Sequence, residues 1–248
     1  MKNIFARIWA LWGLVTFVIT FLIAFIPSMI AYLIPDPKGQ GYFIGVSKVW
    51  MDVWLFLVGC NVRVSGRDNF LQHENYIVVF NHNALLDVPL SAPYVPGANK
   101  TIAKASFVKV PLFGWFYQKG AVLVKRTDER SRIKSFEDMK QVLTNGMHMC
   151  IYPEGTRNRT KESLKPFYDG AFKLAIASNK RIIPCIINGT KRAMPIHKTF
   201  YLLPTPLAMH FMPAVSPTNK TVSELKAEVF NMMKSEFDLR EEISYERK

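Results

Sequence analysis

Acidic residues are scarce in this sequence. Only 19 Asp and Glu stand against 32 Lys and Arg among 248 residues, which gives a formal net charge of +13. A basic excess of this size suits an anionic partner, either nucleic acid or a membrane that carries acidic lipids. No nucleic-acid recognition motif accompanies the charge, so nucleic acid is not an expected partner.

Cysteine is also scarce. The three cysteines are Cys60, Cys150 and Cys185, and no two of them have the spacing of a metal site or a redox motif. Two of them lie inside apolar runs. We therefore expect buried free thiols, a reducing compartment and no bound metal.

Charge of either sign is missing from Ile8 to Pro35. The 19 residues from Ile8 to Ile26 would span ~28 Å as a helix, close to the ~30 Å thickness of a hydrocarbon core. The run is longer than the apolar region of a signal peptide, and no clear cleavage site follows it. It predicts a retained membrane helix, which Pro27 should kink or end.

A second apolar segment runs from about Tyr42 to Val58 and is interrupted by Lys48 and Asp52. These two residues are four apart and would pair on one face of a helix. Because an ion pair is costly in lipid, the segment is expected to lie at the membrane interface or to face protein.

Residues 1–61 are therefore expected to form an N-terminal membrane-embedded or interfacial helical hairpin, and residues 62–248 a separate domain. Lys2 and Arg7 favour a cytoplasmic N-terminus. A hairpin returns the chain to the side on which it began, whether it spans the bilayer or enters one leaflet. The domain is thus expected at the cytoplasmic face of a membrane, with membrane phospholipids as partners of its basic surface.

The region after residue 62 alternates between short apolar runs and longer segments with room for a helix or a loop. Near-continuous apolar strands between helices predict an α/β domain with a mostly parallel sheet flanked by helices. In such sheets, ligands bind at the carboxyl ends of the strands. The expected strands are Tyr76–Phe80, Thr101–Ala103, Ala121–Val124, Met147–Tyr152 and Arg181–Ile187, and the expected helices cover about Ile133–Leu143, Phe167–Ser178 and Thr221–Phe237.

Asn81 and His82 directly follow the first of these strands, where a site would form. Asp87 comes five residues after His82, a spacing that puts the two side chains about 140° apart on an ideal helix. They meet only if a turn intervenes, which Asn83 permits. An aspartate that accepts from one imidazole nitrogen leaves the other nitrogen free as a base. The alternative at this point is a structural histidine with a chance aspartate.

A second polar cluster follows the strand that ends near Tyr152. Its residues are Glu154, Gly155, Thr156 and Arg157. The glycine permits a tight turn with exposed backbone N–H groups, and the arginine can hold two phosphate oxygens at once. The turn is a candidate phosphate cradle, and the alternative is an ordinary surface loop. Lys165, further along, either approaches the same phosphate or is a solvated loop charge.

The strand Ala121–Val124 ends in Lys125 and Arg126. A solvated strand end would be the usual explanation. In a parallel sheet, however, His82, Arg126 and the Glu154–Arg157 turn all project from one edge. Three polar strand ends at one edge predict a single site.

These residues resemble the motifs of the glycerolipid acyltransferase family, specifically its 1-acylglycerol-3-phosphate acyltransferases. The matching blocks span about residues 70–195, and the N-terminal hairpin also resembles that of the family. The blocks are N-H-x-x-x-x-D from Asn81 to Asp87, G-x-x-x-x-x-R from Gly120 to Arg126, [FY]-P-E-G-T-R from Tyr152 to Arg157 and, loosely, an apolar strand with a proline at Ile182–Ile186.

The resemblance implies acyl transfer from a thioester to the sn-2 hydroxyl of lysophosphatidate, giving phosphatidic acid for phospholipid biosynthesis. His82 would act as the general base and Asp87 would orient it. The resemblance implies acyl-CoA or acyl-carrier protein as co-substrate, no cofactor or metal, and the bacterial inner membrane as location. The residues implied to bind the substrate phosphate are Arg126, Glu154, Gly155, Thr156 and Arg157, with Lys104 as a further ligand.

Other functions stay open at this point. Relatives with the same blocks can acylate other lyso-lipids, including lyso-aminolipids without a phosphate, although the basic residues favour a phosphorylated acceptor. A non-catalytic lipid-binding scaffold is disfavoured by the intact His82 and Asp87. A serine hydrolase is disfavoured because S-x-x-K occurs twice, at Ser106–Lys109 and Ser131–Lys134, without companion motifs. Tyr152 stands where Phe is common, a change with no evident consequence in the sequence.

Overall fold

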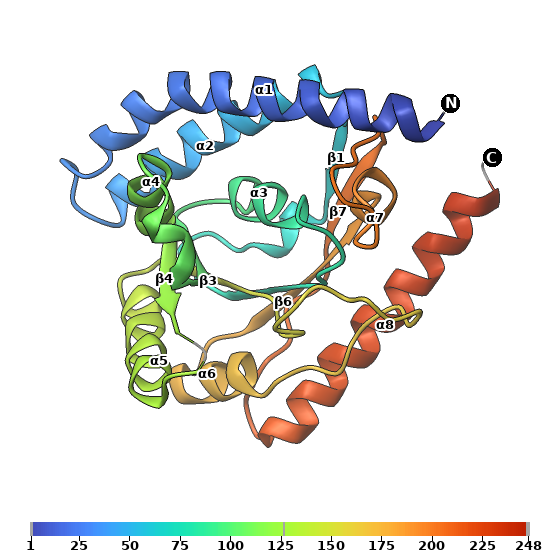
Figure 1. Ribbon diagram of the computed structural model, residues 1–248. Coiled ribbons are helices and arrows are strands. Elements are labelled where there is room, and N and C mark those ends of the chain that lie inside the picture. The colour runs from blue at the N-terminus through green and yellow to red at the C-terminus, as the bar shows by residue number, and fades with distance from the viewer. Residues whose placement is uncertain (1, 126, 247–248) are drawn as a thin grey trace.

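The computed structural model describes residues 2–125 and 127–246. Its centre is a seven-stranded sheet in the order β1-β7-β6-β2-β5-β3-β4 (Figure 1). Five neighbouring strands are parallel, and all five lie where the apolar runs predicted them. They are β2 (Ile77–Phe80), β3 (Asn99–Lys104), β4 (Ala121–Val124), β5 (His148–Ile151) and β6 (Ile182–Asn188).

Two strands at one side of the sheet were not predicted. β7 (Leu207–Phe211) pairs antiparallel with β6, and β1 (Val62–Ser65) pairs parallel with β7. β7 alternates between buried and half-buried positions, and β1 alternates between half-buried and exposed positions, so one face of each strand is less covered than the other. Neither strand is therefore a continuous apolar run, so the pattern that predicts strands buried on both faces does not include them.

Helices cover both faces of the sheet. Ile77 and Val79 point to one face and Val78 and Phe80 to the other, as expected for alternating positions in a strand. Figure 1 shows α1 to α4 on one side and α5, α6 and α8 on the other. The helices are α1 (Lys2–Ile30), α2 (Lys38–Leu57), α3 (Asp87–Ser91), α4 (Phe113–Gly120), α5 (Glu129–Thr144), α6 (Gly170–Ser178), α7 (Thr190–Ala193) and α8 (Val222–Glu246), with 3-10 turns η1 (Arg67–Asn69), η2 (Ala92–Tyr94) and η3 (Ala105–Lys109).

The predicted N-terminal hairpin is present, with α1 and α2 side by side (Figure 1). Pro27 lies inside α1, which continues to Ile30, so the expectation that the helix ends at the proline is wrong. Because proline has no N–H, the helix forgoes one backbone hydrogen bond there, and the chain continues for one further turn after it.

Tryptophan side chains hold the two helices of the hairpin together. The indole N–H groups of Trp9 and Trp12 donate to the backbone oxygens of Val58 and Leu57, 3.0 and 2.9 Å away. These oxygens lie at the end of α2, where no helical partner is left for them. Trp54 donates in the opposite direction, to the Gly13 oxygen at 2.9 Å. The hairpin is thus tied by its own side chains.

The hairpin also packs onto the sheet. Asp52 of α2 forms the predicted ion pair with Lys48 at 2.5 Å and accepts from the Tyr94 hydroxyl at 2.7 Å, so this part of α2 faces protein.

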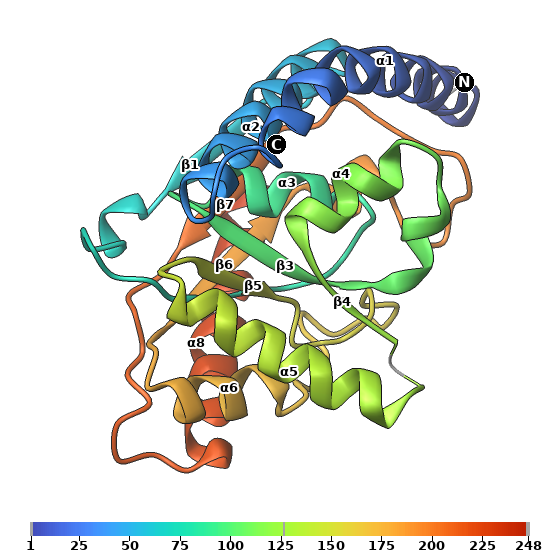
Figure 2. The same ribbon diagram turned by 90° about the vertical axis from the view of Figure 1, so that its left-hand side faces the viewer.

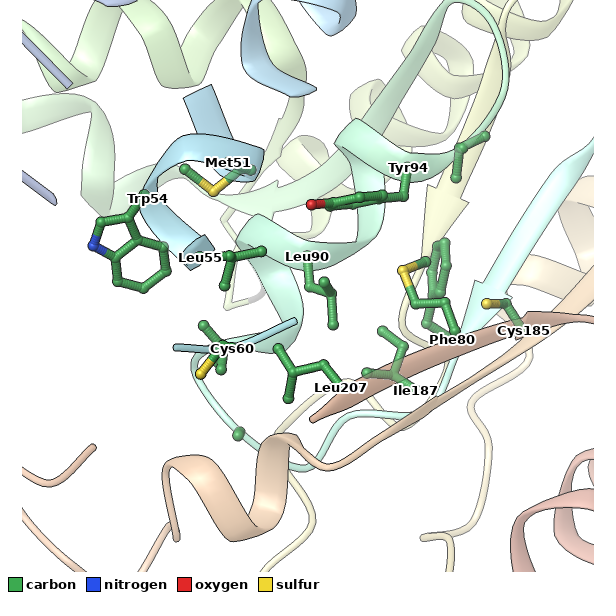
Figure 3. Close-up of a cluster of buried hydrophobic side chains, with 14 of the residues drawn as sticks. Met51, Trp54, Leu55, Cys60, Phe80, Leu90, Tyr94, Cys185, Ile187 and Leu207 are labelled. Carbon is green, nitrogen blue, oxygen red and sulfur yellow. The ribbon is translucent and has the colours of Figure 1, made fainter. Parts of the chain in front are cut away.

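All three cysteines are buried and free, as predicted. One hydrophobic core contains residues from both sides of residue 61, the predicted domain boundary. The division into two domains stays a prediction. Figure 3 shows Met51, Trp54 and Leu55 of α2 facing Phe80, Cys185 and Ile187 of the sheet, with Leu90 and Tyr94 between them.

α1 is, among the described residues, the one helix long and apolar enough to cross a membrane. Much of its surface is apolar and exposed, with Ile8, Ile19 and Ile26 each more than half exposed. By length and composition α1 is able to anchor the protein to a membrane.

Candidate active site

The polar strand ends meet at one edge of the sheet. Val79 of β2 lies beside Ile151 of β5 in the sheet register, so His82 follows its strand next to the turn after β5. Asn81 extends the pairing on the other side: its amide nitrogen donates to the Ile187 oxygen at 2.9 Å, and its amide oxygen accepts from the Ile187 N–H at 2.7 Å. The Asn81 side chain thus bonds to β6 where the backbone of β2 turns away from the sheet. These bonds hold the backbone directly before His82.

His82 and Asp87 form a hydrogen-bonded pair. Nδ1 of His82 lies 2.9 Å from Oδ2 of Asp87. The same oxygen accepts from the backbone N–H groups of Asn83 and Ala84 at 2.6 and 2.7 Å, so the predicted turn at Asn83 forms and places Asp87 at the start of α3. Because an ionised carboxylate only accepts, Nδ1 carries the hydrogen and Nε2 is left as the basic nitrogen.

The two members of the pair differ in exposure. The Asp87 side chain is fully buried, whereas the His82 side chain is 14% exposed. A buried carboxylate beside an imidazole stabilises the protonated ring, and the limited opening lets a substrate reach it. This arrangement can remove a proton from a hydroxyl group that binds above the strand end.

The backbone of His82 is held from both sides by the turn after β5. Its N–H donates to Oε1 of Glu154 at 2.7 Å, and its carbonyl oxygen accepts from the Asn158 N–H at 2.6 Å. Oε2 of Glu154 accepts from the Lys165 N–H at 3.0 Å. Burial raises the pKa of the Glu154 carboxyl, and these backbone donors, together with nearby positive charge, oppose the rise.

The position of Glu154 favours a role other than the phosphate binding expected from the sequence. Its side chain is fully buried, and both carboxylate oxygens accept from backbone groups inside the protein. A carboxylate in this position does not contact the phosphate of a substrate. We therefore assign Glu154 to the positioning of His82 and of the loop at Lys165.

Tyr152 is the site residue whose importance the sequence did not reveal. Its ring centroid lies 4.5 Å from that of His82. Its hydroxyl donates to the Asp87 backbone oxygen at 2.9 Å and lies 2.7 Å from Oγ of Ser91. Burial, with the charge of Asp87, raises the pKa of Tyr152 well above its ordinary value, so the hydroxyl stays protonated. The tyrosine thus connects β5 to α3 behind the His82–Asp87 pair.

Replacing Tyr152 with phenylalanine is expected to lower the free energy of unfolding by about 1 kcal/mol, the usual net value of a buried hydrogen bond. The ring would still pack against His82, so the acyl transfer proposed below should fall only a few-fold. Tyr152→Leu, which also removes the ring, should reduce kcat much more. Urea unfolding and steady-state kinetics of both variants measure this; equal kinetic losses would contradict a separate role for the ring.

Basic and small residues line the same edge. Gly155 has φ +70°, and a Cβ there would lie 2.8 Å from the Tyr168 ring, so glycine is required. Nζ of Lys165 donates to Oγ1 of Thr156 at 2.6 Å, which brings this lysine to the turn. Thr156 is exposed and Arg157 is half-buried.

The remaining predicted phosphate ligands lie further along the edge. Lys104 is exposed at the end of β3, two strands from β2 in the sheet order. Arg126 lies outside the described residues, directly after Lys125, which follows β4. The structure therefore brings together His82, Asp87 and the turn after β5. Binding of phosphate at this edge stays a prediction.

A mostly parallel α/β sheet whose strand ends carry a histidine–carboxylate pair beside a basic turn is suited to the activation of a hydroxyl group. The comparisons with known proteins make this class specific. Residues 61–188 match the family model described as Acyltransferase, which is more than half of the chain, and the protein belongs to this family.

Two curated relatives are named as 1-acyl-sn-glycerol-3-phosphate acyltransferases. The chain is 30% identical over 166 residues to a 1-acyl-sn-glycerol-3-phosphate acyltransferase of Chlamydomonas reinhardtii, covering 66% of this chain and 49% of that one. It is 30% identical over 147 residues to the Saccharomyces cerevisiae protein of the same name, covering 58% and 48%. The chain thus spans about half the length of the curated relatives it matches.

A solved structure confirms the fold. The crystal structure of the 1-acyl-sn-glycerophosphate (LPA) acyltransferase PlsC from Thermotoga maritima matches with a TM-score of 0.82 and 23% identity, covering 97% of this chain and 98% of that one. The predicted α/β fold with a mostly parallel sheet and an N-terminal apolar helix is therefore confirmed.

Proposed function

We propose that the protein transfers an acyl group from a thioester to the sn-2 hydroxyl of 1-acylglycerol-3-phosphate and so produces phosphatidic acid. The observation that carries the proposal is the His82–Asp87 pair, 2.9 Å apart, with Nε2 left as the basic nitrogen at the partly open strand end. The names of the curated relatives support the same reaction.

The proposed reaction uses His82 twice. Its Nε2 takes the proton of the sn-2 hydroxyl while that oxygen attacks the thioester carbonyl, and the Asp87 carboxylate stabilises the imidazolium that forms. The tetrahedral intermediate then expels the thiolate, which receives the proton from His82. One C–O bond forms, one C–S bond breaks, and the histidine returns to its first state. A thioester is already activated, so the proposal includes no metal and no covalent enzyme intermediate.

Binding of the substrates is proposed at the basic edge. Backbone N–H groups of the turn that Gly155 permits, with the side chains of Thr156 and Arg157, are suited to the phosphate of the acceptor. Lys104 and Arg126 are proposed as further phosphate ligands from neighbouring strand ends. The donor is acyl-CoA or acyl-carrier protein, and both are acidic partners that a net charge of +13 would attract.

We further propose that the protein acts at the cytoplasmic face of a membrane, the inner membrane in a bacterium. α1 is held against the rest of the protein along its length: the Leu202 N–H donates to the Ala6 oxygen near its start, and the Tyr32 hydroxyl, just beyond its end, donates to the Trp115 oxygen. A helix bound in this way would lie in one leaflet with its exposed apolar side in lipid.

The test offers purified protein in detergent two acceptors, lysophosphatidate and a lyso-aminolipid, each with acyl-CoA and with acyl-carrier protein as donor. We expect acylation of lysophosphatidate, measured as labelled phosphatidic acid, at a much higher kcat/KM than that of the lyso-aminolipid. Transfer to the aminolipid alone would keep the chemistry and contradict the phosphate-bearing acceptor. Absence of transfer to both, from folded protein, would contradict catalysis.

A further inference from the structure

The segment between β3 and α4 presents an apolar surface to the outside. We call residues Ala105–Trp115 the 105–115 loop; it comprises η3, the connection of residues 110–112 and the first residues of α4. Four of its large apolar side chains are exposed: Phe107 by 47%, Val110 by 45%, Leu112 by 39% and Trp115 by 59%. Four exposed large apolar side chains within eleven residues are a candidate interaction site.

The loop has a defined and partly strained backbone. Leu112 has φ +59° and ψ −53°, a conformation that side chains other than glycine rarely adopt. The Gly114 N–H donates to the Val110 oxygen at 2.7 Å, and a Cβ on Gly114 would lie 2.1 Å from the Val108 oxygen. The surrounding structure therefore holds the loop in one shape, with its apolar side chains outward.

The loop continues the exposed surface of α1. The Trp115 ring stacks on Phe25 with centroids 6.4 Å apart, and the Phe113 ring meets Phe21 at 5.7 Å. Beside these contacts, Leu22 and Ile26 of α1 are exposed. Figure 2 shows α4 on the same side of the sheet as α1 and α2. The loop and α1 thus form one apolar surface.

Two lysines accompany this surface. Lys104 ends β3 and precedes the loop directly, and Lys109 lies within it; both side chains are exposed. Cations beside an apolar surface fit acidic headgroups above acyl chains. A water-soluble partner protein would not explain the continuity with α1, a helix that is apolar enough to cross a bilayer.

We propose that the 105–115 loop is a second membrane-contacting element, which inserts Phe107, Val110 and Leu112 among the acyl chains while Lys104 and Lys109 stay at headgroup depth. The inference rests on the membrane placement in the proposed function and deepens it. It puts the edge of the sheet that carries His82 at the lipid surface, so that a lyso-lipid reaches the base without leaving the leaflet completely.

The proposal is tested with nitroxide labels on cysteines introduced one at a time. The three native cysteines are buried, so a label attaches at the introduced position. Val110→Cys reports on the loop and Ile19→Cys on α1. Ile133→Cys, 61% exposed on α5 across the sheet, is the matched control for an exposed apolar residue that should stay in water. Each labelled protein is bound to vesicles of phosphatidylethanolamine and phosphatidylglycerol, and circular dichroism checks its fold.

The measured quantity is the ratio of two collision rates of the label. One is the rate with oxygen, which is more concentrated in lipid, and the other is the rate with a nickel chelate, which stays in water. We expect the oxygen-to-nickel ratio at Val110→Cys to match that at Ile19→Cys and to exceed that at Ile133→Cys severalfold. A ratio at Val110→Cys equal to that at Ile133→Cys would overturn the inference. If Ile19→Cys kept its lipid-type ratio and the protein still acylated lysophosphatidate, that result would leave the proposed function intact. If Ile19→Cys also reported water, the membrane placement would be wrong and the inference with it.

Discussion

Replacing His82 with alanine is expected to lower the rate of acyl transfer to lysophosphatidate by about 10²–10⁴-fold, the range typical of a positioned general base. The loss should appear in kcat, because the imidazole is needed for proton transfer and not for holding the phosphate. The free energy of unfolding should fall by about 1–3 kcal/mol, because the buried Asp87 carboxylate loses its imidazole partner. The local backbone should stay in place, since the N–H and carbonyl of residue 82 keep their bonds to Glu154 and Asn158.

Asp87→Asn is the graded control for this experiment. One carboxylate oxygen of Asp87 accepts from Nδ1 of His82 and from the backbone N–H groups of Asn83 and Ala84, so an amide oxygen in its place keeps these three bonds. The negative charge that would stabilise the imidazolium is lost, and proton removal by Nε2 becomes less favourable. We expect kcat to fall with KM nearly unchanged. A His82→Ala variant that kept most of the activity would show that the proton leaves by another route.

Glu154→Gln is expected to cause the second large effect, a fall in kcat of an order of magnitude or more with little change in KM for lysophosphatidate. An amide has one oxygen to offer, whereas the carboxylate accepts from two backbone N–H groups, those of His82 and Lys165. One buried donor would lose its partner and face an NH₂ group, at a cost of about 1–3 kcal/mol. The base would be displaced without being removed, and placement governs the rate.

Arg157→Gln is the matched control, because it changes a charged residue of the same turn that is proposed to bind phosphate. We expect it to raise KM for lysophosphatidate more than it lowers kcat. Steady-state kinetics and urea unfolding of both variants decide between the two roles. If Glu154→Gln raised KM alone, Glu154 would be a substrate ligand and the positioning role would be refuted.

The bond from the His82 N–H to Glu154 links the two sequence blocks in the proposed site. One block supplies the proposed base and its aspartate, and the other supplies the carboxylate that holds the backbone of His82. Tyr152 adds a link from β5 to α3 through the Asp87 backbone. The turn after β5 therefore has a part in the geometry of proton transfer as well as in the proposed binding of phosphate.

Sequence patterns predicted the central strands for a clear physical reason. β2, β5 and β6 are buried on both faces, so they appear as continuous apolar runs such as Ile77–Phe80. Parallel strands then bring their ends to one edge, which was enough to expect His82 near the Glu154–Arg157 turn. The buried thiols and the pairing of Lys48 with Asp52 were also predictable, because both follow from local pattern.

The sequence by itself determined the fold class, the helical hairpin and the edge of the sheet at which His82, Asp87 and the turn after β5 meet. Only the tertiary structure decided where the Glu154 carboxylate points, what the Tyr152 hydroxyl binds and which carbonyls Trp9 and Trp12 cap. It also decided the added strands β1 and β7, whose one-sided burial leaves no continuous apolar run. These features depend on partners distant in sequence and on the direction of a side chain after a turn, and no local spacing encodes either.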